Sequence, residues 1–447
     1  MPATTQDLPV VVIGAGPIGL AAAAHLRGRD LPAVVLEAGD EPAANVRGWG
    51  HVRLFSTWDQ LVDDAAAKLL APTGWTSPSS CAYPTGAEWF AHYLQPLAEV
   101  LGDTVRTGHR VTAISRQGAD VMSDSGRDDR PFVLYVDTPD GPQRLLASAV
   151  IDASGTVSTP NPLGADGLPV PGEAANADRI AAGVPDLGDA AVRAQHAGAH
   201  TAVVGAGHTA MNALVALAKV ADEAPGTRIS WVIRRASAAA TYGGGTDDQL
   251  AARGALGMAA KALVDDGTVE VVTGFRIVTV DTADDRLVLR GEDGRTVDGI
   301  DRVVTATGYR PDLSLTSELR VDLHPSVQAR RELAPLIDPN VHSCGSVPPH
   351  GEAELAHPES GFYMVGMKSY GRAPTFLAMT GFEQVRSVVA MLAGDEAAAR
   401  EVQLVLPETG VCGGTGLADD EVADLPTGVS ELPGGLPLTA TTQGGCC

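Results

Sequence analysis

Apolar runs separated by glycine turns dominate the pattern at the start of the chain. From Val10, the residues VVVIGAGPIGLAAAAHL predict a strand, a tight turn and an alanine-rich helix, and a second strand follows over 33–37. An apolar run without alternation is typical of a strand that is covered on both faces of a parallel sheet. These residues therefore predict one βαβ unit.

The same pattern returns in the middle of the chain. Residues 201–219, TAVVGAGHTAMNALVALAK, repeat the strand, turn and helix, and RISWVIRR over 228–235 predicts the next strand. Beside each unit, short strands and tight turns predict a three-stranded meander and a closing apolar strand. These lie at 132–138, 144–149 and 149–156, and again at 286–290, 295–297 and 302–311. We expect an α/β fold with two three-layer Rossmann-like dinucleotide-binding domains, the second inserted in the first.

Proline and glycine mark where the chain crosses between these domains. Residues 157–199 are rich in both and predict the outward crossing, with the return near 308–312. A strand and a long helix over 361–393 then complete the first domain. The expected segments are 1–160 and 312–395 for the first domain, 161–311 for the second, and 396–447 for a flexible acidic tail.

Net charge narrows the range of partners. The 447 residues contain 32 Lys and Arg against 55 Asp and Glu, a net charge of -23. Such a surface repels phosphate backbones and anionic membranes at long range. We therefore expect no nucleic-acid or membrane partner, while a few local residues and helix ends can still bind a phosphorylated cofactor.

The N-terminus and the cysteines predict a cytoplasmic location. The first residues lack a basic region, and the apolar stretch 10–26 is broken by glycines and a proline, so it matches neither a signal peptide nor a membrane span. An odd, scattered set of cysteines argues against a secreted disulfide framework. The five are Cys81, Cys344, Cys412, Cys446 and Cys447.

The first glycine turn carries a dinucleotide fingerprint. Gly14, Gly16 and Gly19 form G-x-G-x-x-G between a strand and a helix, and Glu37 ends the next strand. The first glycine permits the turn, the second lets a pyrophosphate approach, and the third packs helix on strand, while the acid can bind a ribose hydroxyl. An ordinary glycine turn is the alternative interpretation.

The second glycine turn differs at the strand that follows it. Gly205 and Gly207 repeat the motif, with Ala210 in the third position. Where the first copy has an acid, this one has Arg234 and Arg235, which suit the 2′-phosphate of NADPH. A solvated strand end is the alternative. Two such sites on one chain imply hydride transfer between two cofactors.

Three motifs carry a family resemblance. GAGPIGL near the N-terminus, GAGHTAMN at 205–212 and ATGYRPDL at 306–313 resemble the two-dinucleotide-binding-domain flavoproteins, which include flavin-containing monooxygenases and thioredoxin reductase relatives. The resemblance covers about residues 9–393. Residues 46–58 and 366–394 look most like the flavin monooxygenase-like proteins of bacterial arsenic-resistance operons.

The resemblance implies FAD at the first turn, NADPH at the second, and oxidation of a small, soft substrate. Trp49 to Arg53 and the helix start after Gly366 would flank the isoalloxazine ring. Many relatives have an aspartate directly after the glycine of the last strand, whereas Met367 and Lys368 follow Gly366 here. The expected cofactor residues are Gly14, Gly16, Gly19, Glu37, Trp49, Arg53, Gly155, Gly205, Gly207, Thr209, Arg234, Arg235, Gly308, Gly366 and Met367.

The electron acceptor is less constrained. No close cysteine pair lies beside either turn; only Cys446 and Cys447 are adjacent, where either a swinging redox pair or two unimportant thiols can be envisaged. Without a disulfide partner, reduced flavin reacts with oxygen, and a dry pocket can hold the C4a-hydroperoxide that oxygenates sulfur, nitrogen or trivalent arsenic.

A polar segment precedes the last strand. Residues 342–359 concentrate histidine, cysteine and glutamate, but their spacing matches no zinc pattern, and we expect a polar loop of solvated residues rather than a metal site. Cys344 and His350 are the candidates on the substrate side.

The sequence thus predicts a cytoplasmic, NADPH-dependent FAD monooxygenase with a small-molecule substrate and O2 as partners, and a homodimer as one option for its assembly. A reductase that acts on a disulfide or a thiophilic metal through the tail cysteines is the first alternative. A non-catalytic flavin redox sensor is the second.

Overall fold

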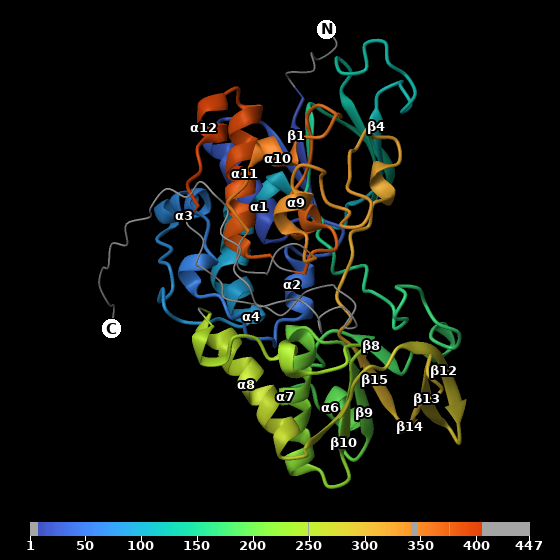
Figure 1. Ribbon diagram of the computed structural model, residues 1–447. Coiled ribbons are helices and arrows are strands. Elements are labelled where there is room, and N and C mark those ends of the chain that lie inside the picture. The colour runs from blue at the N-terminus through green and yellow to red at the C-terminus, as the bar shows by residue number, and fades with distance from the viewer. Residues whose placement is uncertain (1–7, 249, 341–346, 375, 405–447) are drawn as a thin grey trace, which may run out of the picture. The chain divides into compact units, whose positions relative to one another are not determined.

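A computed structural model describes residues 8–248, 250–340, 347–374 and 376–404, and the structural statements below refer to these ranges. Two five-stranded sheets organise the chain (Figure 1). In the first, every strand pairs parallel with its neighbour, in the order β16-β7-β1-β2-β3. Its strands are β1 (Val10–Ile13), β2 (Ala33–Leu36), β3 (Val105–Arg106), β7 (Ala149–Asp152) and β16 (Phe362–Met364).

The first sheet is covered on both faces, which explains its unbroken apolar strands. One face carries helices and the other an antiparallel meander: α1 (Pro17–Gly28), α11 (Ala378–Leu392), β4 (Arg110–Arg116), β5 (Phe132–Thr138) and β6 (Gly141–Ala147). Val10 and Val12 pack in one cluster with residues of α1 and α11. Val11 and Ile13 point the other way and pack with residues of β4 and β5.

The second sheet repeats this plan with the order β11-β10-β9-β15-β8. Its elements are β8 (Ile180–Ala182), β9 (His200–Val204), β10 (Arg228–Val232), β11 (Val269–Val272), β15 (Arg302–Thr305), α7 (His208–Glu223), α8 (Ala251–Asp265), β12 (Ile277–Ala283), β13 (Arg286–Gly291) and β14 (Thr296–Ile300). Val203 packs against α7, while Val204 packs against the β12–β14 meander. Figure 1 shows α7 and α8 on the side of this sheet opposite the meander.

Short helices complete the described chain. They are α2 (Ala44–Gly48), α3 (Asp64–Leu70), α4 (Gly86–Trp89), the π-helical turn η4 (Phe90–Leu94), α5 (Gln95–Leu101), α6 (Ala190–His196), α9 (Ala334–Ile337), α10 (Glu352–Leu355), the 3-10 turn η10 (Gly366–Tyr370) and α12 (Glu396–Arg400). None of the helices within the described ranges has the length and apolar character needed to cross a bilayer.

The predicted fold class is confirmed: both sheets are parallel, and each carries helices on one face and a meander on the other. The domain boundaries stay predictions. The flexible tail expected from residue 396 is wrong at its start, because 396–400 form α12. Ser387 of α11 donates a hydrogen bond of 2.6 Å to the carbonyl of Ala399, which fastens this helix. The remainder of the predicted tail, from residue 405, lies outside the described residues.

Candidate functional site

The first glycine turn joins β1 to α1. Gly14 has a φ of +94°, in the region that glycine adopts most readily, and a Cβ there would lie 2.9 Å from the carbonyl oxygen of Ala153. A Cβ on Gly19 would lie 1.9 Å from the carbonyl oxygen of Gly14. A Cβ on Gly16 would meet no described atom within 4 Å. The first and third glycines therefore serve packing, whereas the second borders open space through which a diphosphate can approach the backbone.

Glu37 directs its half-buried carboxylate toward this turn. Its Oε2 accepts a hydrogen bond of 2.7 Å from the Ala15 N–H, and its Oε1 accepts one of 2.8 Å from the Gly39 N–H. A carboxylate has about four acceptor positions, so two remain for sugar hydroxyls. Gly155, directly after β7, has a φ of +72° and also borders open space.

The second glycine turn has the same construction. Gly205 has a φ of +130°, and a Cβ there would lie 2.2 Å from the carbonyl oxygen of Ala306. A Cβ on Gly207 would meet no described atom within 4 Å. Ala210 is buried against the sheet, and Thr209 is half-buried in the first turn of α7. In both turns, therefore, the first glycine packs closely against backbone, and the second borders open space.

Neither α1 nor α7 has a side-chain cap at its N-terminus. Gly16 and Gly207 hold the capping positions and provide no side-chain hydrogen bond, whereas Asp63 and Asp189 cap α3 and α6 with carboxylates. The first N–H groups of a helix lack intrahelical partners and form the positive end of its dipole. Uncapped helix starts behind a glycine fit an anionic diphosphate, so the residues present suit a dinucleotide at both turns.

The basic residues after β10 differ in exposure. The Arg234 side chain is exposed, while Arg235 is half-buried and its carbonyl accepts a hydrogen bond of 2.6 Å from the Gly274 N–H. Gly308, with a φ of +85°, lies close to the Asn161 side chain at the return crossing. The structure places both arginines after the strand next to the second turn, where the sequence predicted a phosphate contact.

The segment 46–58 contacts the start of α7, directly after the second glycine turn. The ring of Phe55 lies 5.3 Å from that of His208, the first residue of α7, and His51 is 3.0 Å from the carbonyl oxygen of Val184. Trp49 is half-buried, 6.5 Å from Trp89 between ring centroids. The exposed Arg53 contacts the carbonyl of Tyr83 and lies 3.7 Å from Glu88. This segment therefore reaches from the first domain to the start of α7.

The turn at Gly366 lies against the start of α1. Gly366 has a φ of +67°, and a Cβ there would lie 3.2 Å from the Ile18 side chain. Its N–H donates a hydrogen bond of 2.7 Å to Gln384 of α11, and its carbonyl accepts one of 2.7 Å from Ser369. Met367 is half-buried. The turn that follows β16 therefore lies beside the N-terminal end of α1, the helix that begins at the first glycine turn.

His350 is fully engaged by neighbours rather than facing open space. Its side chain is buried, Nδ1 lies 3.1 Å from the carbonyl of Pro348, and Nε2 lies 2.9 Å from Nε2 of Gln384. Because Gln384 donates from that nitrogen, His350 is neutral and carries its proton on Nδ1; burial also lowers its pKa. These contacts favour a role for His350 in supporting the Gly366 turn, through Gln384, over direct contact with a substrate. The companion prediction, Cys344, lies outside the described residues.

The expectation that this polar segment is a solvated loop is wrong for two further residues. Glu359 is 1% exposed and is paired with Arg116 at 2.7 Å and Arg127 at 2.9 Å. His357 is also buried, and its ring lies 5.8 Å from that of Phe362. Among the described residues, no group of three or more metal-ligating side chains is placed to hold a metal ion. His357 and Glu359 therefore contribute buried contacts to the first domain.

A buried ion pair that the sequence did not predict lies beside the first turn. Lys368 and Asp152 are joined by a contact of 2.6 Å, and the Nζ of Lys368 also lies 3.0 Å from the Ser154 hydroxyl. The signal was present as an aspartate that ends the apolar run AVID and a lysine two residues after Gly366. Only the pairing of β7 with β16 brings them together.

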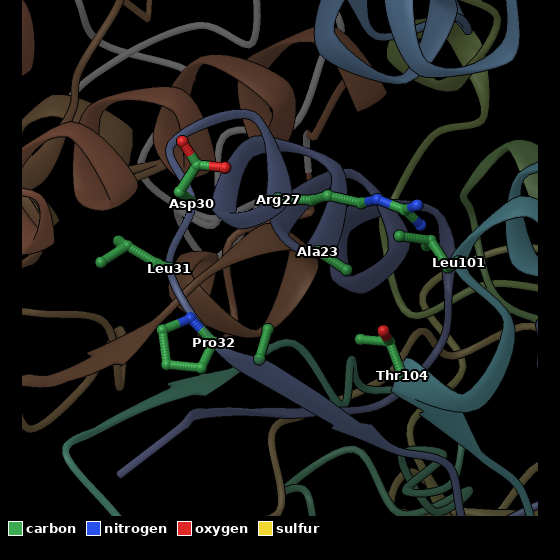
Figure 2. Close-up of a pocket in the computed structure, with 8 residues that line it drawn as sticks. Ala23, Arg27, Asp30, Leu31, Pro32, Leu101 and Thr104 are labelled. Carbon is green, nitrogen blue, oxygen red and sulfur yellow. The ribbon is translucent and has the colours of Figure 1, made fainter. Parts of the chain in front are cut away.

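Figure 2 shows a surface recess lined by Ala23, Arg27, Asp30, Leu31, Pro32, Ala33, Leu101 and Thr104. It lies where α1 ends and β2 begins. Dinucleotides bind outside the carboxyl ends of parallel strands, which is the opposite end of the sheet. The guanidinium of Arg27 is already bonded to the carbonyl of Val100 at 2.9 Å. We assign this recess no part in the chemistry.

Comparison with known proteins gives a family match and several structural likenesses. The pyridine nucleotide-disulphide oxidoreductase family matches residues 11–343. No curated protein sequence matches the chain. A bacillithiol disulfide reductase from Bacillus cereus is similar in structure, with a TM-score of 0.64 at 18% identity, over 87% of this chain and 99% of the other.

Two monooxygenases are similar as well. The FAD-bound cadaverine monooxygenase of desferrioxamine biosynthesis from Erwinia amylovora gives a TM-score of 0.60 at 15% identity, over 90% of this chain and 98% of the other. A mutant flavin monooxygenase from Stenotrophomonas maltophilia gives 0.53 at 21% identity, over 86% and 99%. At these identities the likeness shows the shared fold.

Proposed function

Because this chain belongs to the pyridine nucleotide-disulphide oxidoreductase family, we propose that it is an NADPH-dependent FAD monooxygenase that oxygenates a small, soft nucleophile. The coarser statement, a FAD-dependent oxidoreductase that uses a nicotinamide dinucleotide, follows from the family and the fold. The finer assignment covers trivalent arsenic, sulfur and nitrogen compounds as substrates.

The first turn would bind FAD and the second would bind NADPH. The start of α1 behind Gly16 would hold the FAD diphosphate, and Glu37 would accept hydrogen bonds from its ribose. The start of α7 behind Gly207 would hold the NADPH diphosphate, with Arg234 and Arg235 at the 2′-phosphate. Bound flavin supplies the capacity to accept a hydride and to react with oxygen.

The observation that carries the monooxygenase proposal is the absence of a thiol pair beside the described turns. Cys81 is the single free cysteine in the described ranges, and it is exposed. A dithiol reductase needs two thiols that can exchange with the flavin. With none near either turn among the described residues, oxygen is the acceptor that these surroundings favour.

The experiment is oxygen-isotope labelling. Protein loaded with FAD is incubated with NADPH, 18O2 and a panel of trivalent arsenicals, thiols and amines, and products are analysed by mass spectrometry. We expect oxygen uptake and one labelled oxygen atom in a product. Complete indifference to oxygen with every substrate would remove the monooxygenase proposal.

The reductase alternative is favoured by the family's disulphide chemistry. It would use Cys446 and Cys447, which lie outside the described residues. Truncation after Gly410 discriminates between the two functions. Turnover should survive the truncation in a monooxygenase, whereas a tail-dependent reductase loses it. Steady turnover with any acceptor would count against the redox-sensor alternative.

A further inference from the structure

Lys368 is a cation almost completely removed from water. Its side chain is 1% exposed and that of its partner Asp152 is 0% exposed. Lysine is rarely buried unless it is paired, because an ammonium ion loses its hydration. The Asp152 carboxylate is itself fixed, since its Oδ1 accepts hydrogen bonds from the Ser154 N–H at 3.1 Å and the Ser154 hydroxyl at 2.6 Å. The three residues form one oriented cluster.

The cluster lies at the carboxyl edge of the first sheet. Asp152 is the last residue of β7, and Met364 of β16 pairs with it in register, two residues before the turn that carries Lys368. The backbone that follows β7 forms the wall of the first fingerprint turn, because a Cβ on Gly14 would lie 3.1 Å from the Ser154 Cα. Dinucleotides lie across this edge of a parallel sheet.

The ammonium group has more donors than the protein uses. An ammonium carries three N–H groups. Within the described ranges, the Nζ of Lys368 has two hydrogen-bond partners, Asp152 at 2.6 Å and Ser154 at 3.0 Å. A buried donor without an acceptor is destabilising. The third N–H can therefore donate to an oxygen outside these two residues, either of a water molecule or of a ligand.

The turn that holds Lys368 is supported from its other side. Gln384 bonds to the Gly366 N–H at 2.7 Å, to Ser369 at 2.9 Å and to His350 at 2.9 Å. Gln384 is fully buried, and each of its polar groups is used. The position of the turn is consequently built into the fold and is ready before any ligand binds.

We propose that Lys368 is an FAD-binding residue, which donates its third N–H to an oxygen acceptor of the dinucleotide held at the first glycine turn. Asp152 and Ser154 are positioning residues that aim the ammonium. The turn after β16 thus contacts FAD through a buried donor, since it offers no carboxylate beside Gly366. This inference rests on the proposed FAD site.

The test is FAD affinity, measured apart from activity. Wild type, K368M and K368R are stripped of flavin and titrated with FAD by flavin fluorescence, and the thermal midpoint of each FAD-free protein is recorded. We expect K368M to raise the FAD Kd about tenfold or more, because it removes a charge-assisted hydrogen bond. K368R, which keeps a cationic donor, should lie closer to wild type.

Arg116→Met is the matched control. Arg116 is another buried cation of the first domain, paired with Glu359 at 2.7 Å, and it belongs to β4 of the meander. Its loss should lower the thermal midpoint while leaving the FAD Kd within twofold of wild type. If K368M unfolds, the double variant D152N/K368M removes the pair as a unit and should show the same weakened FAD binding.

The outcomes separate the two proposals. A K368M or D152N/K368M protein that binds FAD within twofold of wild type would overturn the role of Lys368 and leave the proposed function intact. A wild-type protein that binds no FAD would contradict the proposed function itself.

Discussion

The two glycine turns share a backbone plan but differ in the residue that ends the neighbouring strand. Asp152 pairs in register with Ile13 beside the first turn, and Thr305 pairs with Val204 beside the second. Asp152 holds the buried Lys368, whereas no described charged side chain bonds to Thr305. The same strand, turn and helix therefore carry a buried charge cluster in one domain and a neutral strand end in the other.

The difference extends to the exposure of the groups proposed to contact each cofactor. Around the first turn, Lys368 and Gln384 are buried; Lys368 bonds to Ser154, and Gln384 bonds to Ser369, the residue after Lys368. Beside the second turn, Arg234 is exposed and Arg235 is half-buried. A buried, preformed set suits a flavin that stays bound through turnover, and an exposed one suits a nicotinamide that exchanges. On the proposed assignment, the same architecture would provide a resident site and an exchanging site through a few residues around each turn.

The largest effect is expected from exchanging the third positions of the two motifs. Gly19→Ala places a Cβ 1.9 Å from the Gly14 carbonyl oxygen. We expect the free energy of unfolding to fall by about 3 kcal/mol, because the overlap involves backbone that cannot move aside. The reverse change, Ala210→Gly, should cost about 1 kcal/mol from helix propensity. Urea unfolding of the FAD-free proteins measures both, and equal effects would show that the two turns pack alike.

The next effect concerns the basic residues of the second site. Arg234→Ala with Arg235→Ala should raise the KM for NADPH about 30-fold, since the 2′-phosphate loses its charge-assisted partners. The KM for NADH should change less than about threefold, as NADH lacks that phosphate. Steady-state kinetics with both nucleotides provides the measurement. A parallel loss with NADH would argue that the arginines act on the strand rather than on the phosphate.

A pH effect on stability is expected from His357, a buried histidine of the first domain. Burial lowers the pKa of His357 from 6.5 to about 4. The unfolded chain takes up a proton below pH 6.5 while the folded protein does not, so stability falls as pH falls through this window. His357→Gln should therefore reduce the loss of stability between pH 7 and pH 5 by about 2 kcal/mol. Urea unfolding at the two pH values tests this, and an unchanged pH dependence would speak against it.

The smallest effect is expected at an exposed ion pair of the second domain. Arg228 and Glu270 lie 3.9 Å apart on neighbouring strands, with side chains 62% and 69% exposed. Solvent screens such a pair, so Arg228→Ala should change the free energy of unfolding by less than about 0.5 kcal/mol. A loss several times larger would mean that this strand end is more tightly coupled to the sheet than its exposure implies.

The sequence predicted the elements that local pattern determines. The glycine turns followed from apolar strands that meet alanine-rich helices, because strand period and turn chemistry act over a few residues. Lys368 and Asp152 were missed, since their contact depends on β16 lying beside β7. The contact of His350 with Gln384 could not be predicted either, because Gln384 lies later in the chain on α11. Contacts between segments that lie far apart in the chain, rather than local sequence, determine these positions.

The central claim is that one chain holds FAD at the first turn and NADPH at the second, close enough for hydride transfer. Anaerobic addition of NADPH to the FAD-loaded, gel-filtered protein tests it most directly, with the visible absorbance of bound flavin as the signal. The account predicts that the flavin band survives gel filtration, bleaches with NADPH and returns when oxygen is admitted. A protein that retains no flavin, or whose bound flavin keeps its colour in excess NADPH, would contradict it.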